Sequence, residues 1–393
     1  MKAITDLDGV YASGVSCGIK KSGLDLAYIF VPDATSCAGV YTRNAFRGAC
    51  IEHTRSCIQN GHVKAVIINS GNSNVATGTK GEENVARTAA KAASLLQLSP
   101  EQVAVSSTGI IGKQLPIEKL KLGLEELLAN PFQKNGTLAA EAILTTDLRK
   151  KTSFRSCIID GQEIWIGGFA KGSGMIAPNM GTMLAYLVIN TAIPQSVLQM
   201  MLASAADASF NMVSVDTDTS TSDMVLLFST SEHTVDLHPE TLAVLRSLIE
   251  EVCVDLAKMI ARDGEGAEKL LEAEVTDAAS VADARSIALS IVSSPLVKAA
   301  VHGADPNWGR VIMALGKTPN VRVDPNRVEV YFGPTKVFGN GQPCESAARE
   351  LVAEYLKNEE VSIRVCLNLG TAHARAWGCD LTKRYVEINV DYN

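Results

Sequence analysis

The sequence predicts an α+β fold, a layered α/β sandwich, and three observations support this prediction. Strand-like and helix-like segments alternate irregularly along the 393 residues, unlike the regular alternation of a doubly wound α/β fold. No GxGxxG motif follows the first strand pattern, as a Rossmann fold would require. Hydrophobic residues make up 46% of the chain and charged residues 20%, as in a well-packed globular enzyme. The length suffices for two or three domains, or for one large intertwined unit.

The first half of the chain contains two strand patterns, each followed by a loop of small residues. VKAVIINSGNSN (63–74) predicts a strand that runs into an Asn/Gly/Ser turn. VAVSSTGIIGKQLP (103–116) predicts a strand whose loop can turn backbone N–H groups towards a ligand at Gly109 and Gly112. Between them, EENVARTAAKAASLLQL (82–98) has acidic residues at its front and apolar residues at helical spacing, and it predicts a helix.

The second half predicts two helices, a buried strand and a strand-rich end. SVLQMMLASAADASF (196–210) predicts an amphipathic helix, and HPETLAVLRSLIEEVCVDLAKMIARDG (238–264) predicts a long helix that ends at a glycine. Between them, DTDTSTSD (216–223) predicts a polar turn and MVLLFST (224–230) a buried strand. The remaining predictions are strands at RVEVYFG (327–333), VSIRVCLNLG (361–370) and YVEINVDY (385–392), with a helix at ESAARELVAEYLKN (345–358).

Composition excludes several classes of function. The net charge of −7 and the lack of Lys/Arg runs argue against nucleic acid as a partner. No apolar stretch approaches the roughly 20 residues of a membrane span, and the first residues lack a signal-peptide layout. The nine cysteines are scattered without a CxxC pair, so we expect reduced thiols and a cytoplasmic location. The six histidines form no HExxH motif or Cys/His cluster, and we expect no metal site.

KGSGMIAPNMGTMLAYLVIN (171–190) begins as a basic, glycine-rich loop and ends as a strand, with Thr182 at the junction. A threonine becomes a nucleophile when its own α-amine is free to act as base. That amine has an ordinary pKa of about 7.7–8.0, so it can exchange a proton near neutral pH. An internal threonine reaches this state only if the preceding bond is cut, and Gly181 would let the backbone bend for the attack. The residues alone leave two interpretations open: a self-cleaving nucleophile, or a loop that closes onto a core strand.

Several stretches outside residues 171–190 are similar to sequence motifs of one enzyme family. They are SGVSCGIKKSGLDLA (13–27), INSGNSNVATG (68–78), SSTGIIGKQLP (106–116), ILTTD (143–147), RDGEGAEK (262–269), SPLVKAAVHGADPNWGR (294–310) and the closing NVDYN. Together with KGSGMIAPNMGTML they resemble the ornithine acetyltransferase family, the glutamate N-acetyltransferases of arginine biosynthesis. The resemblance covers nearly the whole chain.

This resemblance implies cleavage between Gly181 and Thr182, which gives an α chain of residues 1–181 and a β chain of residues 182–393. It also implies that the two chains assemble as an α2β2 heterotetramer or a larger oligomer. The family commonly has alanine where Gly181 stands, so cleavage here is expected to be slower but not abolished. We expect the halves to stay interleaved, because strands on both sides of residue 182 share one core.

The resemblance assigns Thr182 as the nucleophile and Thr108 and Gly109 as the oxyanion hole. Positioned donors of this kind contribute several kcal/mol to lowering a barrier. Without the family, the better interpretation of Thr108 and Gly109 is a turn from strand to loop.

Four further residues match the family's substrate contacts. Thr145 lies in the TTD motif, with Thr146 as the alternative if the register is off by one. Lys171 offers a cation to a substrate carboxylate, and Glu265 offers a carboxylate to the ornithine ammonium. Taken singly, either charge is expected to be a solvated surface group. Asn389 matches the family's substrate-binding asparagine near the C-terminus; the hydroxyl residue that follows it in the family has no match here, so one substrate contact is in doubt.

The segment VDTDTSTSD departs from the family pattern. The family usually has glycine where Thr217 stands and asparagine where Ser222 stands. The segment contains three acidic residues, Asp216, Asp218 and Asp223. Their carboxylates could bind a metal, but we prefer the interpretation that their side-chain oxygens cap turns. DPNWGR (305–310) is expected to shape the cleft or a chain interface, and Trp308 is expected to pack rather than to take part in chemistry.

The sequence therefore predicts an acetyltransferase that moves acetyl from N2-acetyl-L-ornithine to L-glutamate through an acetyl-threonine, without a cofactor. Use of acetyl-CoA as a second donor is open. One alternative is a self-processing amidohydrolase or aminopeptidase in which water is the acceptor. Another is a binding module whose Lys171-Gly-Ser-Gly loop holds phosphate, but a P-loop has its lysine after the last glycine.

Overall fold

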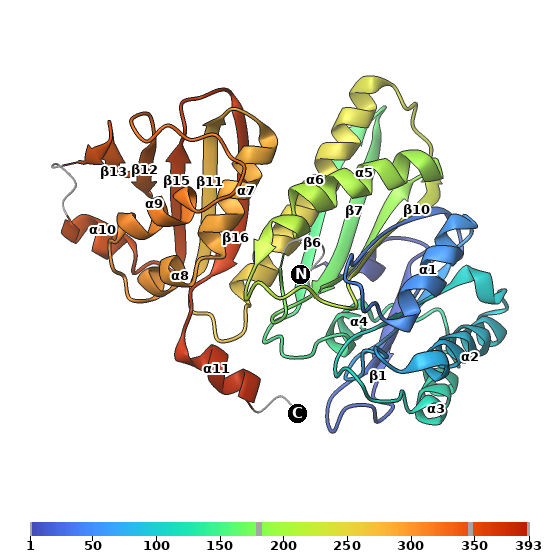
Figure 1. Ribbon diagram of the computed structural model, residues 1–393. Helices are drawn as coiled ribbons and strands as arrows, with labels where there is room; N and C mark the ends of the chain where they lie inside the picture. The colour runs from blue at the N-terminus through green and yellow to red at the C-terminus, as the bar shows by residue number, and fades with distance from the viewer. Residues whose placement is uncertain (1, 178–182, 345–348, 391–393) are drawn as a thin grey trace. The chain divides into compact units, whose positions relative to one another are not determined.

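The computed structural model describes residues 2–177, 183–344 and 349–390 (Figure 1). Within these ranges the chain divides into two compact units, neither of which is continuous in sequence. The described residues of unit 1 are 2–172, 183–207 and 219–256, and those of unit 2 are 173–177, 208–218, 257–344 and 349–390. The mixed α/β composition and the layered sheets described below confirm the predicted fold class.

Unit 1 contains a four-stranded sheet in the order β1-β2-β4-β5. The strands are β1 (Tyr11–Val15), β2 (Leu26–Phe30), β4 (Ala65–Asn69) and β5 (Val103–Ser107). β4 and β5 run parallel, and the other pairs are antiparallel. The helices of this part are α1 (Ala49–Gln59), α2 (Gly78–Leu96), α3 (Ile117–Leu127) and α4 (Gly136–Ala142). β2, β4 and β5 are buried along their whole length, as expected of strands covered on both faces.

The second sheet of unit 1 has five strands in the order β3-β10-β8-β7-β6. They are β3 (Ala34–Tyr41), β6 (Lys151–Ile159), β7 (Gln162–Lys171), β8 (Leu184–Thr191) and β10 (Met224–His233). Alternate side chains of β8 and β10 join the core formed by the first sheet, among them Tyr186 and Phe228. The two sheets therefore form successive layers around one shared core.

Strand pairing in this sheet crosses the expected cleavage point. β7 pairs antiparallel with β8, with Lys171 opposite Leu184 and Phe169 opposite Tyr186. β10 then pairs parallel with β8 and antiparallel with β3. Segments from both sides of residue 182 are thus interleaved in one sheet, as predicted, and the division into compact units does not fall at Gly181/Thr182.

Two helices of the second half pack against the outer strands of this sheet. In α5 (Gln195–Ala208), the Gln195 amide bonds both the N–H and the carbonyl of Cys37 on β3, at 3.0 and 2.6 Å. Gln199 repeats this with Gly39, at 3.0 Å for each bond. The edge strand β3 therefore has backbone groups satisfied by side chains. α6 (Pro239–Arg262) confirms the long helix predicted at 238–264.

Unit 2 is built on a seven-stranded sheet in the order β14-β13-β12-β15-β11-β16-β9. The strands are β9 (Val213–Ser214), β11 (Leu270–Ala278), β12 (Glu329–Phe332), β13 (Thr335–Gly339), β14 (Gln342–Pro343), β15 (Glu360–Cys366) and β16 (Ala372–Cys379). Its helices are α7 (Val281–Val292), α8 (Pro295–His302), α9 (Trp308–Gly316), α10 (Arg349–Tyr355) and α11 (Lys383–Val390). In the described ranges, only the bent pair α7 and α8 taken together reaches the length and apolar composition of a membrane span; no single helix does.

The strand predicted at 385–392 is wrong over its described residues, 385–390, because the chain forms helix α11 there. The Thr382 hydroxyl accepts a hydrogen bond from the Arg384 N–H at 3.1 Å, as a helix N-cap does. Arg384 and Glu387 add an ion pair at i,i+3 spacing. The valine and isoleucine alternation that suggested a strand has no sheet to join, and none of the helix residues is fully buried.

Candidate active site

The predicted oxyanion residues Thr108 and Gly109 lie just beyond the end of β5, in unit 1. Thr108 is buried, and its N–H donates to the Asn69 carbonyl at 3.0 Å. Gly109 has φ +130°, and a Cβ there would lie 2.4 Å from the carbonyl carbon of Gly71. Only glycine fits this close backbone approach. Because the Thr108 N–H is occupied, its hydroxyl is the group that Thr108 can offer to an oxyanion.

Lys171 and Thr145 lie together in unit 1. Lys171 is the last residue of β7, and its Nζ lies 3.1 Å from Thr145 Oγ1. Its residue exposure is 2%, so the expectation of a solvated surface charge is wrong. Lys171 was also expected in a loop, whereas it pairs with Leu184 of β8.

The Asp147 carboxylate stabilises this buried cation electrostatically, and it is a residue for which no role was predicted. Its Oδ1 accepts from Lys151 Nζ at 2.6 Å and from the Gly172 N–H at 2.7 Å. Its Oδ2 accepts from the Thr145 N–H at 3.1 Å. Burial alone would raise the pKa of Asp147, but Lys151 and Lys171 outweigh it and lower that pKa below its usual value. The third residue of the TTD motif was the signal that could have identified it.

Glu265 and Asn389 lie together in unit 2. Asn389 Nδ2 donates to Glu265 Oε2 at 2.7 Å and to the Tyr385 carbonyl at 2.9 Å. The Glu265 N–H donates to the Ser173 carbonyl at 3.0 Å. A Cβ on Gly174 would lie 2.3 Å from the Glu265 carboxyl carbon, so this glycine makes room for the carboxylate. Glu265 is 9% exposed, which again contradicts a solvated surface charge.

The predicted nucleophile Thr182 and its neighbour Gly181 lie outside the described residues, but residues on both sides of them are described. Met183 donates its N–H to Asp223 Oδ1 at 2.9 Å within unit 1. Within unit 2, Asp216 Oδ2 accepts from the Met175 N–H at 2.6 Å, and Oδ1 accepts from the Ile176 N–H at 2.9 Å. Of the three acids predicted to cap turns, Asp216 does so within the described part of the chain, because its Oδ1 also accepts from the Asp218 N–H at 3.2 Å.

The residue that departs from the family's glycine is held in a left-handed conformation. Thr217 has φ +70°, which is strained for a β-branched side chain. Met175, whose N–H bonds Asp216, also has a left-handed φ of +56°. Thr217 follows Asp216 in the sequence, and Met175 donates its backbone N–H to the Asp216 carboxylate. Both strained residues are therefore direct neighbours of Asp216. Strain of this kind is concentrated at functional sites.

The predicted site residues therefore fall into two groups. Unit 1 holds Thr108, Gly109 and the Lys171–Thr145 pair, and unit 2 holds the Glu265–Asn389 pair. The neighbouring alternative Thr146 is half-buried. In the DPNWGR motif, Trp308 stacks on Phe338 with ring centroids 5.3 Å apart, which confirms the expectation that it packs.

One cluster in unit 2 has side chains of the kind that bind metals. Ligand atoms of Glu268, His302 and Asp380 lie within 4.8 Å of one another. Asp380 Oδ1 accepts from the N–H groups of Glu268 and Lys269, at 2.9 Å each, and Oδ2 bonds His302 Nδ1 at 2.9 Å. These bonds make Asp380 a structural anchor for the loop at 268–269.

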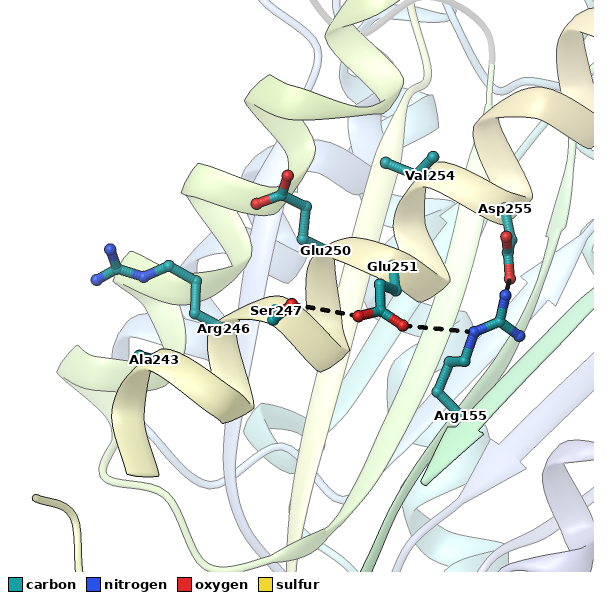
Figure 2. Close-up of a pocket in the computed structure, with 8 residues that line it drawn as sticks. All are labelled: Arg155, Ala243, Arg246, Ser247, Glu250, Glu251, Val254 and Asp255. Carbon is teal, nitrogen blue, oxygen red and sulfur yellow. Dashed lines mark hydrogen bonds and ion pairs between the residues drawn. The ribbon is translucent and has the colours of Figure 1, made fainter. Parts of the chain in front are cut away.

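A surface groove on α6, with a volume of about 370 Å³, contains none of the predicted site residues (Figure 2). Figure 2 shows the Arg155 side chain between Glu251 and Asp255, to which it forms ion pairs. Asp255 also accepts from Ser153 Oγ at 2.8 Å. These contacts join α6 to β6 within unit 1.

Comparison with known proteins gives a match over nearly the whole chain. The profile of the ArgJ family matches residues 11–393. The arginine biosynthesis bifunctional protein ArgJ of Prochlorococcus marinus (strain NATL2A) is 43% identical, covering 99% of this chain and 94% of the relative. The protein of the same name from Bacillus licheniformis is 43% identical, covering 98% and 95%.

A solved structure also matches. The crystal structure of arginine biosynthesis bifunctional protein ArgJ from Bacillus halodurans is 39% identical, with a TM-score of 0.49, and the match covers 54% of this chain and all of that one. The family profile and the curated relatives extend over both compact units. This chain belongs to the ArgJ family.

Proposed function

We propose that this protein is a glutamate N-acetyltransferase of arginine biosynthesis, which moves an acetyl group from N2-acetyl-L-ornithine to L-glutamate. The observation that carries the proposal is the full-length similarity to relatives named as bifunctional ArgJ proteins. The Lys171–Thr145 and Glu265–Asn389 pairs support it further, because Lys171 and Glu265 are buried. An amino-acid substrate carries both carboxylate and ammonium groups, and a buried cation and a buried carboxylate suit them.

In the proposed reaction, Thr182 first becomes an N-terminal residue by scission of the Gly181–Thr182 bond. Its Oγ then attacks the acetyl carbonyl carbon while its α-amine accepts the hydroxyl proton. The Thr108 hydroxyl and the Gly109 N–H donate to the oxyanion. The carbonyl–nitrogen bond breaks, the leaving nitrogen takes a proton from the α-ammonium, and ornithine departs.

The second half of the cycle reverses these steps with another amine. The amino group of L-glutamate attacks the acetyl-threonine, its proton passes to the Thr182 α-amine, and the ester bond to Oγ breaks. Lys171 binds a substrate carboxylate and Glu265 the ornithine side-chain ammonium, with Thr145 and Asn389 fixing these two groups. No cofactor enters the cycle. We further propose that the α chain (1–181) and β chain (182–393) form an α2β2 enzyme in the cytoplasm.

The word bifunctional in the relatives' names supports acetyl-CoA as a second acetyl donor, which would add an N-acetylglutamate synthase activity. The second candidate function, a self-processing amidohydrolase or aminopeptidase, shares the nucleophile but uses water as acceptor. An assay with acetyl-labelled N2-acetylornithine distinguishes them: the proposal predicts label in N-acetylglutamate only when glutamate is present. Release of free acetate at the same rate with and without glutamate would contradict it, and replacing the donor by acetyl-CoA tests the second activity.

A further inference from the structure

Lys20 lies in unit 1, in the SGVSCGIKKSGLDLA motif, for which the proposed reaction has no use so far. The buried carboxylate of Asp25 holds the loop that carries it. Asp25 Oδ1 accepts from the Cys17 N–H at 2.6 Å, and Oδ2 accepts from the N–H groups of Ile19 and Lys20 at 2.7 and 2.9 Å. Hydrogen bonds to an ionised group are the strong ones, so the backbone from which the Lys20 side chain projects is fixed.

The aliphatic part of Lys20 packs against the loop that supports the proposed oxyanion hole. A Cβ on Gly71 would lie 2.6 Å from Lys20 Cγ, so the side chain uses space that only a glycine leaves open. Gly71 is also the residue whose carbonyl carbon a Cβ on Gly109 would meet at 2.4 Å. Lys20 and the oxyanion glycine Gly109 therefore both pack directly against Gly71.

The ammonium end of Lys20 reaches the substrate-binding residues of unit 1. Its Nζ donates to the Leu144 carbonyl at 3.0 Å, while Lys171 Nζ donates to Oγ1 of the next residue, Thr145, at 3.1 Å. Because consecutive Cα atoms are about 3.8 Å apart, the two ammonium groups approach one short segment of the chain. Lys171 is buried, whereas Lys20 is half-buried, so Lys20 keeps access to solvent at this segment.

The surroundings of Lys20 leave its ammonium group able to bind an anion. Among the described residues, the Leu144 carbonyl is the one hydrogen-bond partner of Nζ, and an ammonium group has three donors. Burial lowers the pKa of Lys20, and three nearby carboxyl groups oppose this shift. They belong to Asp25, Asp147 and Glu141, and each is bound to backbone N–H groups or to another lysine. Donors of Lys20 therefore remain for a ligand.

The two amino acids of the proposed reaction differ in the charge of their side chains. Ornithine carries an ammonium group and L-glutamate a carboxylate, so selection of glutamate calls for a cation besides the one that binds the α-carboxylate. We propose that Lys20 selects the acetyl acceptor, binding the side-chain carboxylate of L-glutamate while Lys171 binds its α-carboxylate. The inference rests on the proposed function, because it needs glutamate as the acceptor.

A purely structural role for Lys20 is the competing explanation. The Leu144 carbonyl lies just beyond the C-terminal end of α4, and a cation at that end of a helix stabilises the fold. Such a role does not depend on which acceptor is offered to the enzyme. L-Glutamine separates the two explanations, because it has the α-groups and nearly the shape of glutamate but a neutral side chain.

The test measures kcat/KM of the purified full-length enzyme for L-glutamate and for L-glutamine, with acetyl-labelled N2-acetylornithine as donor. Lys20→Met keeps an apolar stem against Gly71 and removes the ammonium group. Its preference for glutamate over glutamine should fall about tenfold or more, as expected for the loss of a hydrogen bond between charged groups. The loss should come mainly from a higher KM for glutamate. KM for N2-acetylornithine, which has no side-chain carboxylate, should stay nearly unchanged.

Three other variants sharpen the test. Lys21→Met is the matched control, because it removes the exposed lysine next in the sequence, and it should keep the wild-type preference. Lys171→Met removes the cation assigned to the α-carboxylate, which both acceptors carry, so it should slow both equally and leave the preference unchanged. Lys20→Arg keeps the charge and should recover part of the preference. Both acceptors are measured on one preparation, so their ratio does not depend on the folded fraction.

The outcomes distinguish this inference from the proposed function. A Lys20→Met enzyme that loses activity equally with both acceptors, or that keeps the wild-type preference, would overturn the selective role of Lys20. If that variant yields no folded protein, Lys20→Gln carries the same prediction and the same contradiction, because it keeps a donor for the Leu144 carbonyl but no charge. Either contradiction leaves the proposed function intact as long as the wild type converts glutamate to N-acetylglutamate. A wild-type enzyme that forms none would overturn the proposed function itself.

Discussion

The Lys171 ammonium donates a hydrogen bond to Thr145 Oγ1 across 3.1 Å, joining the end of β7 to a residue 26 positions earlier. Lys171 is 2% exposed, and its charge acts on the Asp147 carboxylate. A buried cation held in this way is a preorganised site for an anion, because it has already lost most of its contact with water.

Lys171→Met should reduce kcat/KM for both N2-acetylornithine and glutamate by about 10–100-fold, since a hydrogen bond to a charged group contributes about 1.5–3 kcal/mol. Lys171→Arg should recover part of the loss by keeping the charge. Lys150→Met, which removes an exposed lysine nearby, is the control in steady-state kinetics. Equal effects of the changes at 150 and 171 would contradict a substrate role for Lys171.

Glu265→Gln should raise KM for N2-acetylornithine by about tenfold and that for glutamate much less, because only ornithine carries a side-chain ammonium. Glutamine can still accept the Asn389 hydrogen bond, so the change removes the charge and not the contact. The exposed neighbour Glu268 provides the matched control, Glu268→Gln. If both substrates lost affinity equally, Glu265 would have a structural role.

Thr217→Gly should stabilise the protein, because it relieves a left-handed residue that costs roughly 1–2 kcal/mol. Part of this gain is offset by the greater freedom of glycine in the unfolded chain, so we expect a rise of roughly 2 °C in the unfolding midpoint. Thr217→Ala keeps the strain and should show no such rise. A glycine variant that melts at or below the alanine variant would contradict the assignment of strain to this position.

The raised pKa of Asp216 predicts a specific pH dependence of stability. The folded protein binds this proton more tightly than the unfolded chain does, so the contribution is fully present below the usual pKa of the carboxyl group. It is lost as the pH rises through about 6. Asp216→Asn cannot titrate, so the melting temperature of wild type minus that of the variant should fall between about pH 4 and pH 7. A difference that stays constant over this range would contradict the raised pKa.

Periodicity and apolar runs were sufficient to predict the elements that form the core. The continuous apolar run before Asn190 forms β8, MVLLFST forms most of β10, and the length of the 238–264 pattern gives α6. Such patterns succeed because burial on both faces leaves few alternatives. The same reasoning failed at 385–392, where alternating valine and isoleucine residues lie on an exposed helix with a threonine cap.

The charged site residues were identified by family motif, but their surroundings were not predictable. Lys171 and Glu265 are buried because Asp147 and the glycine at 174 accommodate them, and these contacts depend on tertiary packing. The acids at 216 and 223 bind N–H groups about 40 residues earlier in the chain. A sequence pattern reports local turns well, and it contains no signal for such distant partners.

The central claim is that Thr182 becomes a free N-terminus before it acts. The most direct measurement is N-terminal sequencing and intact mass of the purified, active protein. We predict two polypeptides, one starting at Met1 and ending at Gly181 and the other starting Thr182-Met183-Leu184, with Thr182→Ala giving a single inactive chain. Full activity in material that consists of one uncut polypeptide would contradict the account.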